Sequence, residues 1–135
     1  MNVLITGGGG FLGGQLAEAI LRRGTLTGPC GGEREVRRVR LFDARFGVGF
    51  EDPRVELVTG DMGDRESVDL AVGEDADLSV FHLASMVSGE CELRFDDALR
   101  VNLDGGRHLF EAVRRLDGLQ RLVFASSIAC FGGAA

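Results

Sequence analysis

Short apolar runs alternate along the chain with segments in which apolar residues recur every three or four positions. A short apolar run is typical of a buried strand, whereas a recurrence of that period places apolar side chains on one face of a helix. The runs predict strands at residues 3–5, 36–43, 55–59, 78–83 and 122–125. The periodic segments predict helices at residues 11–23, 65–72 and 93–116.

This alternation of strands and helices predicts an α/β fold. Parallel strands joined by helices take right-handed crossovers, which give a parallel sheet with helices on both faces. For a doubly wound sheet of the Rossmann type we expect the strand order 3-2-1-4-5, with a ligand crevice between the carboxyl ends of the first and fourth strands. No repeat or linker divides the sequence, so we expect residues 1–135 to form one domain.

Two segments carry more specific expectations. Residues 25–35 are polar and rich in glycine, so we expect a long surface loop there. In the helix predicted at residues 93–116, a stripe of apolar and small residues at helical spacing is expected to face the core. These residues are Leu99, Leu103, Gly106, Phe110 and Val113.

Four consecutive glycines stand between the first predicted strand and the first helix. Glycines let the backbone approach a phosphate closely, and the amino end of the helix supplies N–H groups and the positive end of its dipole. Two registers fit, because Gly8, Gly10 and Gly13 match GxGxxG while Gly7, Gly10 and Gly13 match GxxGxxG. A glycine-rich turn is common in itself, but the strand before it and the helix after it indicate dinucleotide binding.

An aspartate ends the second predicted strand. Asp43 stands where a carboxylate binds the ribose of NAD, although an aspartate that only closes a strand is also common. It lies farther from the glycines than the usual ~20 residues, which the insertion at residues 25–35 explains. A carboxylate repels the extra phosphate of NADP, so NAD is favoured, while Arg40 and Arg45 keep NADP as the minor alternative.

Few other side chains suggest chemistry. Asp61 and Met62 follow the third strand, where they suit an adenine ring or form an ordinary turn. The two histidines are not spaced with cysteines or acids as in a metal site, so no metal is expected. Ser126 and Ser127 follow the fifth strand, where α/β active sites lie, although serines often simply end a strand.

Composition limits the remaining function classes. The 135 residues are 44% hydrophobic and 27% charged, as in a soluble globular protein. The net charge of −6 disfavours nucleic-acid binding, and no apolar run approaches the ~18 residues of a membrane span. There is no signal-peptide pattern, and three widely spaced cysteines indicate reduced thiols in the cytoplasm. Tyrosine and lysine are both absent from the sequence, so these residues supply neither a phenol nor an amine as acid or base.

Together these motifs resemble the extended short-chain dehydrogenase/reductase superfamily, in particular its NAD-dependent epimerase/dehydratase family. The similar stretches follow the family's order from end to end of the chain. They are residues 6–13 (TGGGGFLG), Asp43, residues 60–62 (GDM), residues 82–85 (HLAS), residues 102–106 (NLDGG) and residues 124–132 (FASSIACFG).

The resemblance implies roles for the matching positions. It assigns the cofactor pyrophosphate to Gly7, Gly10, Phe11, Leu12 and Gly13. It assigns the adenosine ribose to Asp43 and the adenine to Asp61 and Met62. The residues after the fourth strand that would line the cofactor are Leu83, Ala84 and Ser85. Asn102 would be structural, and Ser127 matches the catalytic serine, which hydrogen-bonds the reacting oxygen.

Three stretches are most similar to dehydrogenases of short sugar acids such as D-erythronate. They are residues 86–90 (MVSGE), 95–102 (FDDALRVN) and 126–133 (SSIACFGG). This similarity implies NAD-dependent oxidation of a secondary hydroxyl to a keto acid, with Ser88 as a substrate contact. The alternatives are a nucleotide-sugar epimerase or dehydratase, and a non-catalytic NAD-binding module.

The sequence departs from the family at one important point. Family chemistry uses a Tyr-x-x-x-Lys pair downstream of the serine, and neither residue type occurs here. We therefore expect residues 1–135 to be the N-terminal part of a longer enzyme, with the Rossmann sheet truncated after its fifth strand and the C-terminal substrate lobe absent. Alone, these residues are not expected to transfer hydride. The resemblance implies that the full-length form is a homodimer acting on a small-molecule substrate.

Overall fold

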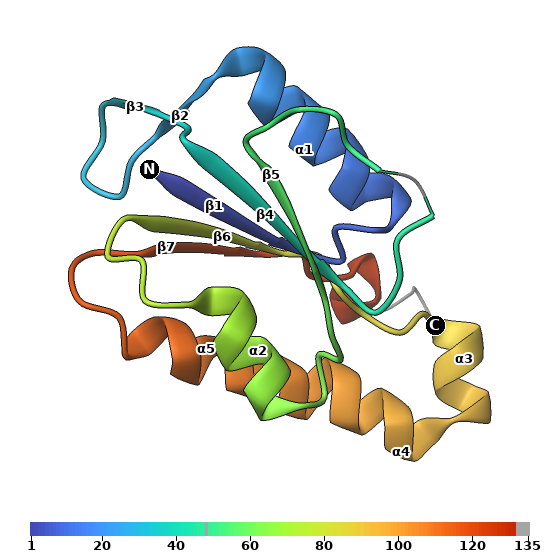
Figure 1. Ribbon diagram of the computed structural model, residues 1–135. Coiled ribbons are helices and arrows are strands. Elements are labelled where there is room, and N and C mark those ends of the chain that lie inside the picture. Colours follow the sequence, from blue (N-terminus) through green and yellow to red (C-terminus); the bar gives the residue numbers. More distant parts are fainter. Residues whose placement is uncertain (48, 132–135) are drawn as a thin grey trace.

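The computed structural model describes residues 1–47 and 49–131, which are organised around a five-stranded parallel sheet (Figure 1). Its strands are β1 (Asn2–Thr6), β4 (Arg38–Asp43), β5 (Val55–Thr59), β6 (Leu78–His82) and β7 (Arg121–Phe124). The helices packed on it are α1 (Phe11–Arg23), α2 (Arg65–Val72) and α5 (Gly105–Arg114). The order across the sheet is β5-β4-β1-β6-β7, which confirms the predicted order 3-2-1-4-5 of the parallel strands.

Alternation of side chains along β1 divides the core into two halves. Val3 and Ile5 pack in one buried cluster with α1, whereas Leu4 packs in the other cluster with α2 and α5. All three side chains are fully buried, as expected for the central strand of a sheet covered on both faces. Figure 1 shows this arrangement, with α1 on one face of the sheet and α2 and α5 on the other.

Residues at the helix ends explain why α1 and α2 have the predicted bounds. Gly24 ends α1 in the left-handed conformation, with φ of 73°, and its N–H donates to the Ile20 carbonyl. Asp64 precedes α2, and its carboxylate accepts the Ser67 N–H at 3.0 Å. Hydrogen bonds from Ser67 also lower the pKa of Asp64, which keeps this cap ionised.

The surface loop predicted before the second main strand is partly wrong, because its two ends pair. They form an antiparallel hairpin of β2 (Thr25–Thr27) and β3 (Glu33–Glu35). Arg121, which lies 94 positions beyond Thr27, donates to the carbonyls of Thr27 at 2.7 Å and Gly28 at 2.8 Å. The hairpin is therefore tied to β7 by a contact that no local pattern reveals.

The long helix predicted at residues 93–116 is instead a succession of shorter elements. They are α3 (Ser88–Leu93), α4 (Phe95–Ala98) and the π-helical segment η1 (Leu99–Asp104), which runs into α5. A π turn holds more residues than an α turn, so the face presented to the sheet rotates along the segment.

The predicted core stripe on this helix is wrong at three of its positions for the same reason. Leu99, Leu103 and Phe110 are exposed. The buried face of α5 is made by Gly105, Gly106, Leu109, Ala112 and Val113. Gly105 packs against the turn that follows β5. An added Cβ on Gly105 would lie only 2.7 Å from the Met62 carbonyl oxygen in that turn. That close approach, rather than the apolar periodicity, sets the orientation of the helix.

Candidate functional site

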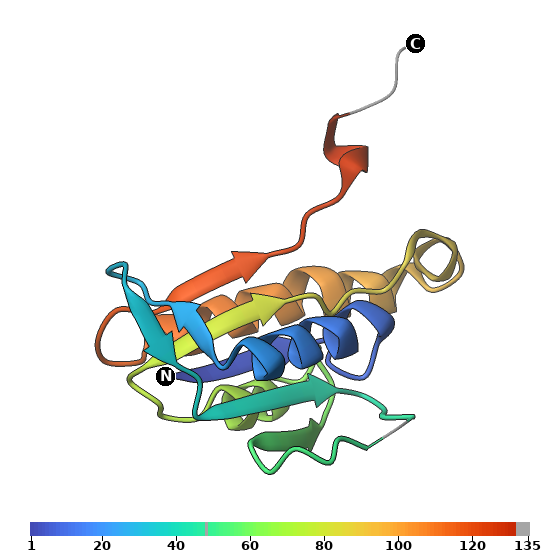
Figure 2. The same cartoon turned by 90° about the horizontal axis from the view of Figure 1, so that it is seen from above.

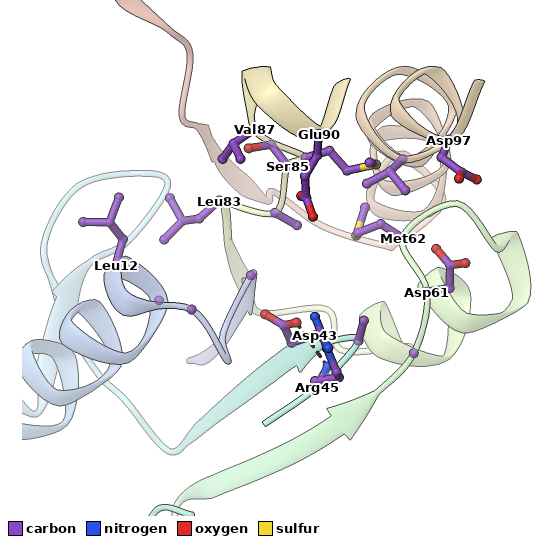
Figure 3. A pocket seen from close by; sticks show the side chains of 18 of the residues that line it. Leu12, Asp43, Arg45, Asp61, Met62, Leu83, Ser85, Val87, Glu90 and Asp97 are labelled. Atoms are coloured by element: carbon purple, nitrogen blue, oxygen red, sulfur yellow. Dashed lines mark hydrogen bonds between the residues drawn. The ribbon is translucent and has the colours of Figure 1, made fainter. Parts of the chain in front are cut away.

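A cleft of about 620 Å³ opens at the carboxyl ends of β1, β4, β5 and β6 (Figure 3). This size lies within the ~300–1,000 Å³ usual for small-molecule sites. Every residue predicted to contact the cofactor lines it: Gly7, Gly10, Phe11, Leu12, Gly13, Asp43, Asp61, Met62, Leu83, Ala84 and Ser85. The fold thus brings into one cleft residues that the sequence motifs placed in separate segments.

The glycine turn forms one wall of the cleft. Gly7 has φ of 74°, in the left-handed region that favours glycine. Gly13 lies so close to the turn that an added Cβ would be 2.2 Å from the Gly7 carbonyl oxygen. Gly8 packs away from the cleft, where its Cβ would meet that of Leu41 at 2.6 Å. The spacing that faces the cleft is therefore GxxGxxG rather than GxGxxG.

Asp43 ends β4 and fastens the glycine turn. Its Oδ2 accepts the Gly9 N–H at 3.0 Å, and its Oδ1 accepts the Arg45 N–H at 3.2 Å. Each carboxylate oxygen can accept more than one hydrogen bond, so Asp43 retains capacity for ligand hydroxyl groups. In Figure 3, Asp43 and Glu90 project into the cleft from opposite walls.

Of the two arginines that kept NADP as an alternative, only Arg45 lines the cleft. Arg40 donates to the carbonyls of Ala71 at 2.8 Å and Val72 at 3.2 Å, and to Glu56 at 3.1 Å. These contacts satisfy carbonyl groups that the end of α2 leaves unpaired. The suggestion that Arg40 meets a second phosphate is therefore wrong, because its side chain is committed to α2.

Asp61 follows β5 and is held by two donors. The Gly63 N–H donates to its Oδ1 at 2.8 Å, and Nη1 of Arg100 donates to its Oδ2 at 2.7 Å. The hydrogen bond with Asp61 raises the pKa of Arg100, so the guanidinium stays charged. Met62 lines the cleft beside Asp61 (Figure 3), which gives this end both an apolar surface and a fixed acceptor.

The segment after β6 forms another wall and is tied to β1. The N–H of Leu83 donates to the Thr6 carbonyl at 3.1 Å, and the N–H of Ala84 donates to the Thr6 hydroxyl at 3.2 Å. Farther along, the Asn102 amide accepts from the Met86 N–H at 2.8 Å and donates to the Met86 carbonyl at 3.2 Å. These bonds fix the course of the wall, consistent with a structural role for Asn102.

Buried His82 lies beneath this wall. Its Nδ1 is 2.6 Å from Thr6 Oγ1, and its ring centroid is 5.4 Å from that of Phe124. The Thr6 hydroxyl, which accepts the Ala84 N–H, has both a proton and a further lone pair with which to bond Nδ1, so it ties the ring of His82 to the backbone of this wall. Burial lowers the pKa of His82, so the folded chain favours the neutral ring.

We expect the fold to lose stability as the pH falls below about 6.5. An unfolded histidine has a pKa of ~6.5, and that of His82 is lower, so the unfolded state binds the proton first. The contribution of the neutral ring to the free energy of unfolding is fully present above pH 6.5. It decreases as the pH falls from 6.5 to the lower pKa of His82 in the folded state. Thermal unfolding followed by circular dichroism between about pH 5 and pH 8 measures the effect.

Two single substitutions separate His82 from the other histidine. His82→Gln should flatten the pH dependence, because it removes the titrating ring from the network with Thr6. His108→Gln is the comparison, because it removes the other histidine of the sequence and leaves the contact between His82 and Thr6 in place. If the melting temperature changed with pH equally in the parent and His82→Gln proteins, the role given to His82 would be contradicted.

Of the two residues predicted to act on the substrate, Ser127 does not line the cleft. Ser127 is exposed and follows β7, where the chain leaves the sheet (Figure 2) and turns into the 3₁₀ helix η2 (Ile128–Phe131). The Ser127 carbonyl accepts the Cys130 N–H at 3.1 Å. Ser88 begins α3, and its side chain lies outside the described part of the structure. Both assignments stay predictions.

Sequence reasoning missed the wall contributed by α3, α4 and η1. The residues that line the cleft from these elements and from the junction between α3 and α4 are Glu90, Arg94, Asp97, Arg100 and Val101. Arg94, Asp97 and Arg100 recur every three positions, so a search for polar periodicity in the predicted helix groups part of this wall. Contact between Arg100 and Asp61 depends on the packing of η1 and has no local signal.

Other kinds of site are not found among residues 1–47 and 49–131. No group of three or more His, Cys, Asp or Glu side chains there is placed to hold a metal ion. In the same residues, no helix has both the length and the apolar character needed to cross a membrane. Cys30, Cys91 and Cys130 are free thiols.

The parallel sheet and the glycine turn at its switch point define the class: a Rossmann-type protein with a cleft at the carboxyl edge of the sheet. The model of the NAD dependent epimerase/dehydratase family matches residues 3–135, and the chain belongs to this family. The resemblance predicted from the motifs is thereby confirmed.

Individual relatives include dehydrogenases and an epimerase. D-erythronate dehydrogenase from Cupriavidus necator is 47% identical over 133 residues, which are 98% of this chain and 40% of that protein. A nucleoside-diphosphate-sugar epimerase structure from Agrobacterium tumefaciens is 34% identical with a TM-score of 0.79, over 96% of this chain and 38% of that one. A uronate dehydrogenase variant from the same organism, complexed with NAD, is 28% identical with a TM-score of 0.71, over 93% of this chain and 40% of that one.

The chain thus spans about 40% of the length of the D-erythronate dehydrogenases that it matches.

Proposed function

We propose that residues 1–135 are the cofactor-binding domain, in its N-terminal part, of an NAD-dependent dehydrogenase. In this proposal the whole enzyme oxidises a secondary hydroxyl of a short sugar acid, such as D-erythronate, to a keto acid. The observation that carries it is the 47% identity with D-erythronate dehydrogenase across 98% of this chain. The matched region includes both the glycine turn, where the cofactor would bind, and the segment after β7 that carries Ser127.

The cleft suits NAD on its own geometry. At Gly7 and Gly13 an added Cβ would collide with backbone atoms of the segment after β6 and of the turn itself, so glycine is needed for the turn to pack closely and present its N–H groups to a pyrophosphate. Asp43 offers acceptors for ribose hydroxyls, and its charge favours NAD over NADP. Asp61 and Met62 would hold the adenine, while the other lining residues predicted for the cofactor would pack along it.

Bound NAD would supply the hydride acceptor, and the residues of this chain would orient it. Ser127 would hydrogen-bond the reacting oxygen, and Ser88 would contact the substrate. The family's Tyr-x-x-x-Lys pair does not occur in these 135 residues, so in this proposal the base that takes the hydroxyl proton belongs to the rest of the enzyme. The proposal includes a cytoplasmic homodimer as the full-length form.

The test is oxidation of D-erythronate by the native gene product that carries residues 1–135. We expect NADH to form when D-erythronate and NAD are mixed with this protein, as measured by its absorbance. The reaction should be slower when NADP is used in place of NAD, because the Asp43 carboxylate repels the additional phosphate group of NADP. Absence of NADH with D-erythronate and with other short hydroxy acids would sink the proposal.

A second candidate is a nucleotide-sugar epimerase or dehydratase, which the 34% identity and TM-score of 0.79 with the Agrobacterium tumefaciens epimerase favour. In that case the purified protein would retain NAD and convert a nucleotide-linked sugar without net NADH. A non-catalytic NAD-binding module, the third alternative, predicts that the native gene product binds NAD and turns over neither substrate.

A further inference from the structure

The ion pair between Asp61 and Arg100 joins two walls of the cleft that lie 39 positions apart in the sequence. Arg100 comes from η1, and Asp61 from the turn after β5. The bond from Arg100 Nη1 to Asp61 Oδ2 is 2.7 Å long, and the Gly63 N–H occupies Oδ1 at 2.8 Å. Each carboxylate oxygen therefore has its own donor, and the plane of the carboxylate is fixed.

The surroundings of Arg100 are shaped for this contact. Gly63 leaves room for the guanidinium, since an added Cβ there would lie 2.1 Å from Arg100 Nη1. Asp97, which precedes it on the same face, has a carboxylate oxygen 3.8 Å from Arg100 Nε. Both residues of the pair remain about half exposed, so a ligand in the cleft can reach them.

A carboxylate held in one orientation can distinguish purines by the substituent at their six-position. Adenine carries an amino group at its six-position, which donates to a carboxylate oxygen, whereas hypoxanthine carries a carbonyl oxygen there. A carboxylate oxygen repels that carbonyl oxygen, and no hydrogen lies between the two facing acceptors, which costs free energy. The discrimination is lost if the carboxylate can rotate away.

We propose that Arg100 is a positioning residue that makes the cleft selective for adenine over 6-oxopurines, by holding the Asp61 carboxylate in a fixed orientation. This inference rests on the proposed function, because it takes the cleft to bind a dinucleotide. It assigns to Arg100 no direct contact with the ligand.

Binding of two dinucleotides to the native gene product tests the role. Isothermal titration calorimetry with NAD and with nicotinamide hypoxanthine dinucleotide gives the preference ratio. We expect the parent protein to favour NAD by about tenfold or more, and Arg100→Gln to lose most of that ratio through weaker binding of NAD. Arg100→Lys, which keeps the charge and one donor, should restore part of it. Adding Arg100→Gln to Asp61→Asn should change the ratio little, because the two residues act as one unit.

Arg107→Gln is the matched control. Arg107 lies on the next helix and also pairs with carboxylates, those of Asp104 and Glu111, but it does not line the cleft. The Arg107→Gln protein should prefer NAD over nicotinamide hypoxanthine dinucleotide by the same ratio as the parent protein.

Two results would overturn the inference while leaving the proposed function intact: Arg100→Gln keeping the full ratio, or losing affinity equally for both ligands, as a merely structural role predicts. A parent protein that binds neither dinucleotide would overturn the proposed function and this inference with it.

Discussion

Replacing Gly13 by valine is expected to weaken NAD binding by about 100-fold or more and to destabilise the fold. The new Cβ would lie 2.2 Å from the Gly7 carbonyl oxygen and 2.8 Å from the Gly8 Cα. Both are backbone atoms that cannot rotate aside, so α1 or the glycine turn must move. Overpacking of this kind costs ~1–3 kcal/mol, and a displaced turn no longer presents its N–H groups to a pyrophosphate.

Gly14→Ala provides the control for Gly13→Val. Gly14 is the next residue of the same helix, and an added Cβ there meets nothing within 4 Å. Alanine is also a better helix former than glycine by ~1 kcal/mol. We therefore expect Gly14→Ala to bind NAD as the parent does and to unfold at the same or a higher temperature. Calorimetric titration and thermal unfolding measure both variants, and a Gly13→Val protein with parental affinity would refute the account of the turn.

The parts of the fold that the sequence predicted are those determined by contiguous residues. The strands alternate with helices, and chirality then leaves few topologies, so the sheet order followed from the pattern. The cleft lining that comes directly after strands was predictable for the same reason, since Gly7, Asp43, Asp61 and Leu83 each follow or end a strand. In a parallel sheet those ends necessarily meet at one edge.

What the sequence did not predict depends on contacts between distant residues. The hairpin at residues 25–35 is held by Arg121, and the predicted core stripe failed because Gly105 packs on the Met62 carbonyl after a π-helical turn. Arginine is the clearest case. Arg40, Arg45 and Arg100 look alike in the sequence, yet the first supports the end of α2 and the other two line the cleft.

That distinction bears on cofactor choice, because Arg45 is the arginine left beside Asp43. Replacing Asp43 by alanine is expected to weaken NAD binding by ~10–100-fold, since hydrogen bonds to a charged group contribute ~1.5–3 kcal/mol. The change removes the acceptor for the N–H groups of Gly9 and Arg45, which loosens the turn. It also removes the negative charge that repels a second phosphate. NADP should therefore lose much less affinity than NAD.

The ratio of the two dissociation constants, measured by calorimetry on the native gene product, separates these effects. Asp43→Asn keeps a hydrogen-bond acceptor but not the charge, so it should hold the turn better than alanine while still narrowing the preference for NAD. Glu111→Gln removes an equal charge from α5, where Glu111 pairs with Arg65 at 3.4 Å outside the cleft, and should leave the ratio unchanged. If Asp43→Ala weakened NAD and NADP equally, Asp43 would serve only the turn, and the choice of cofactor would have to lie with Arg45 or another residue of the cleft.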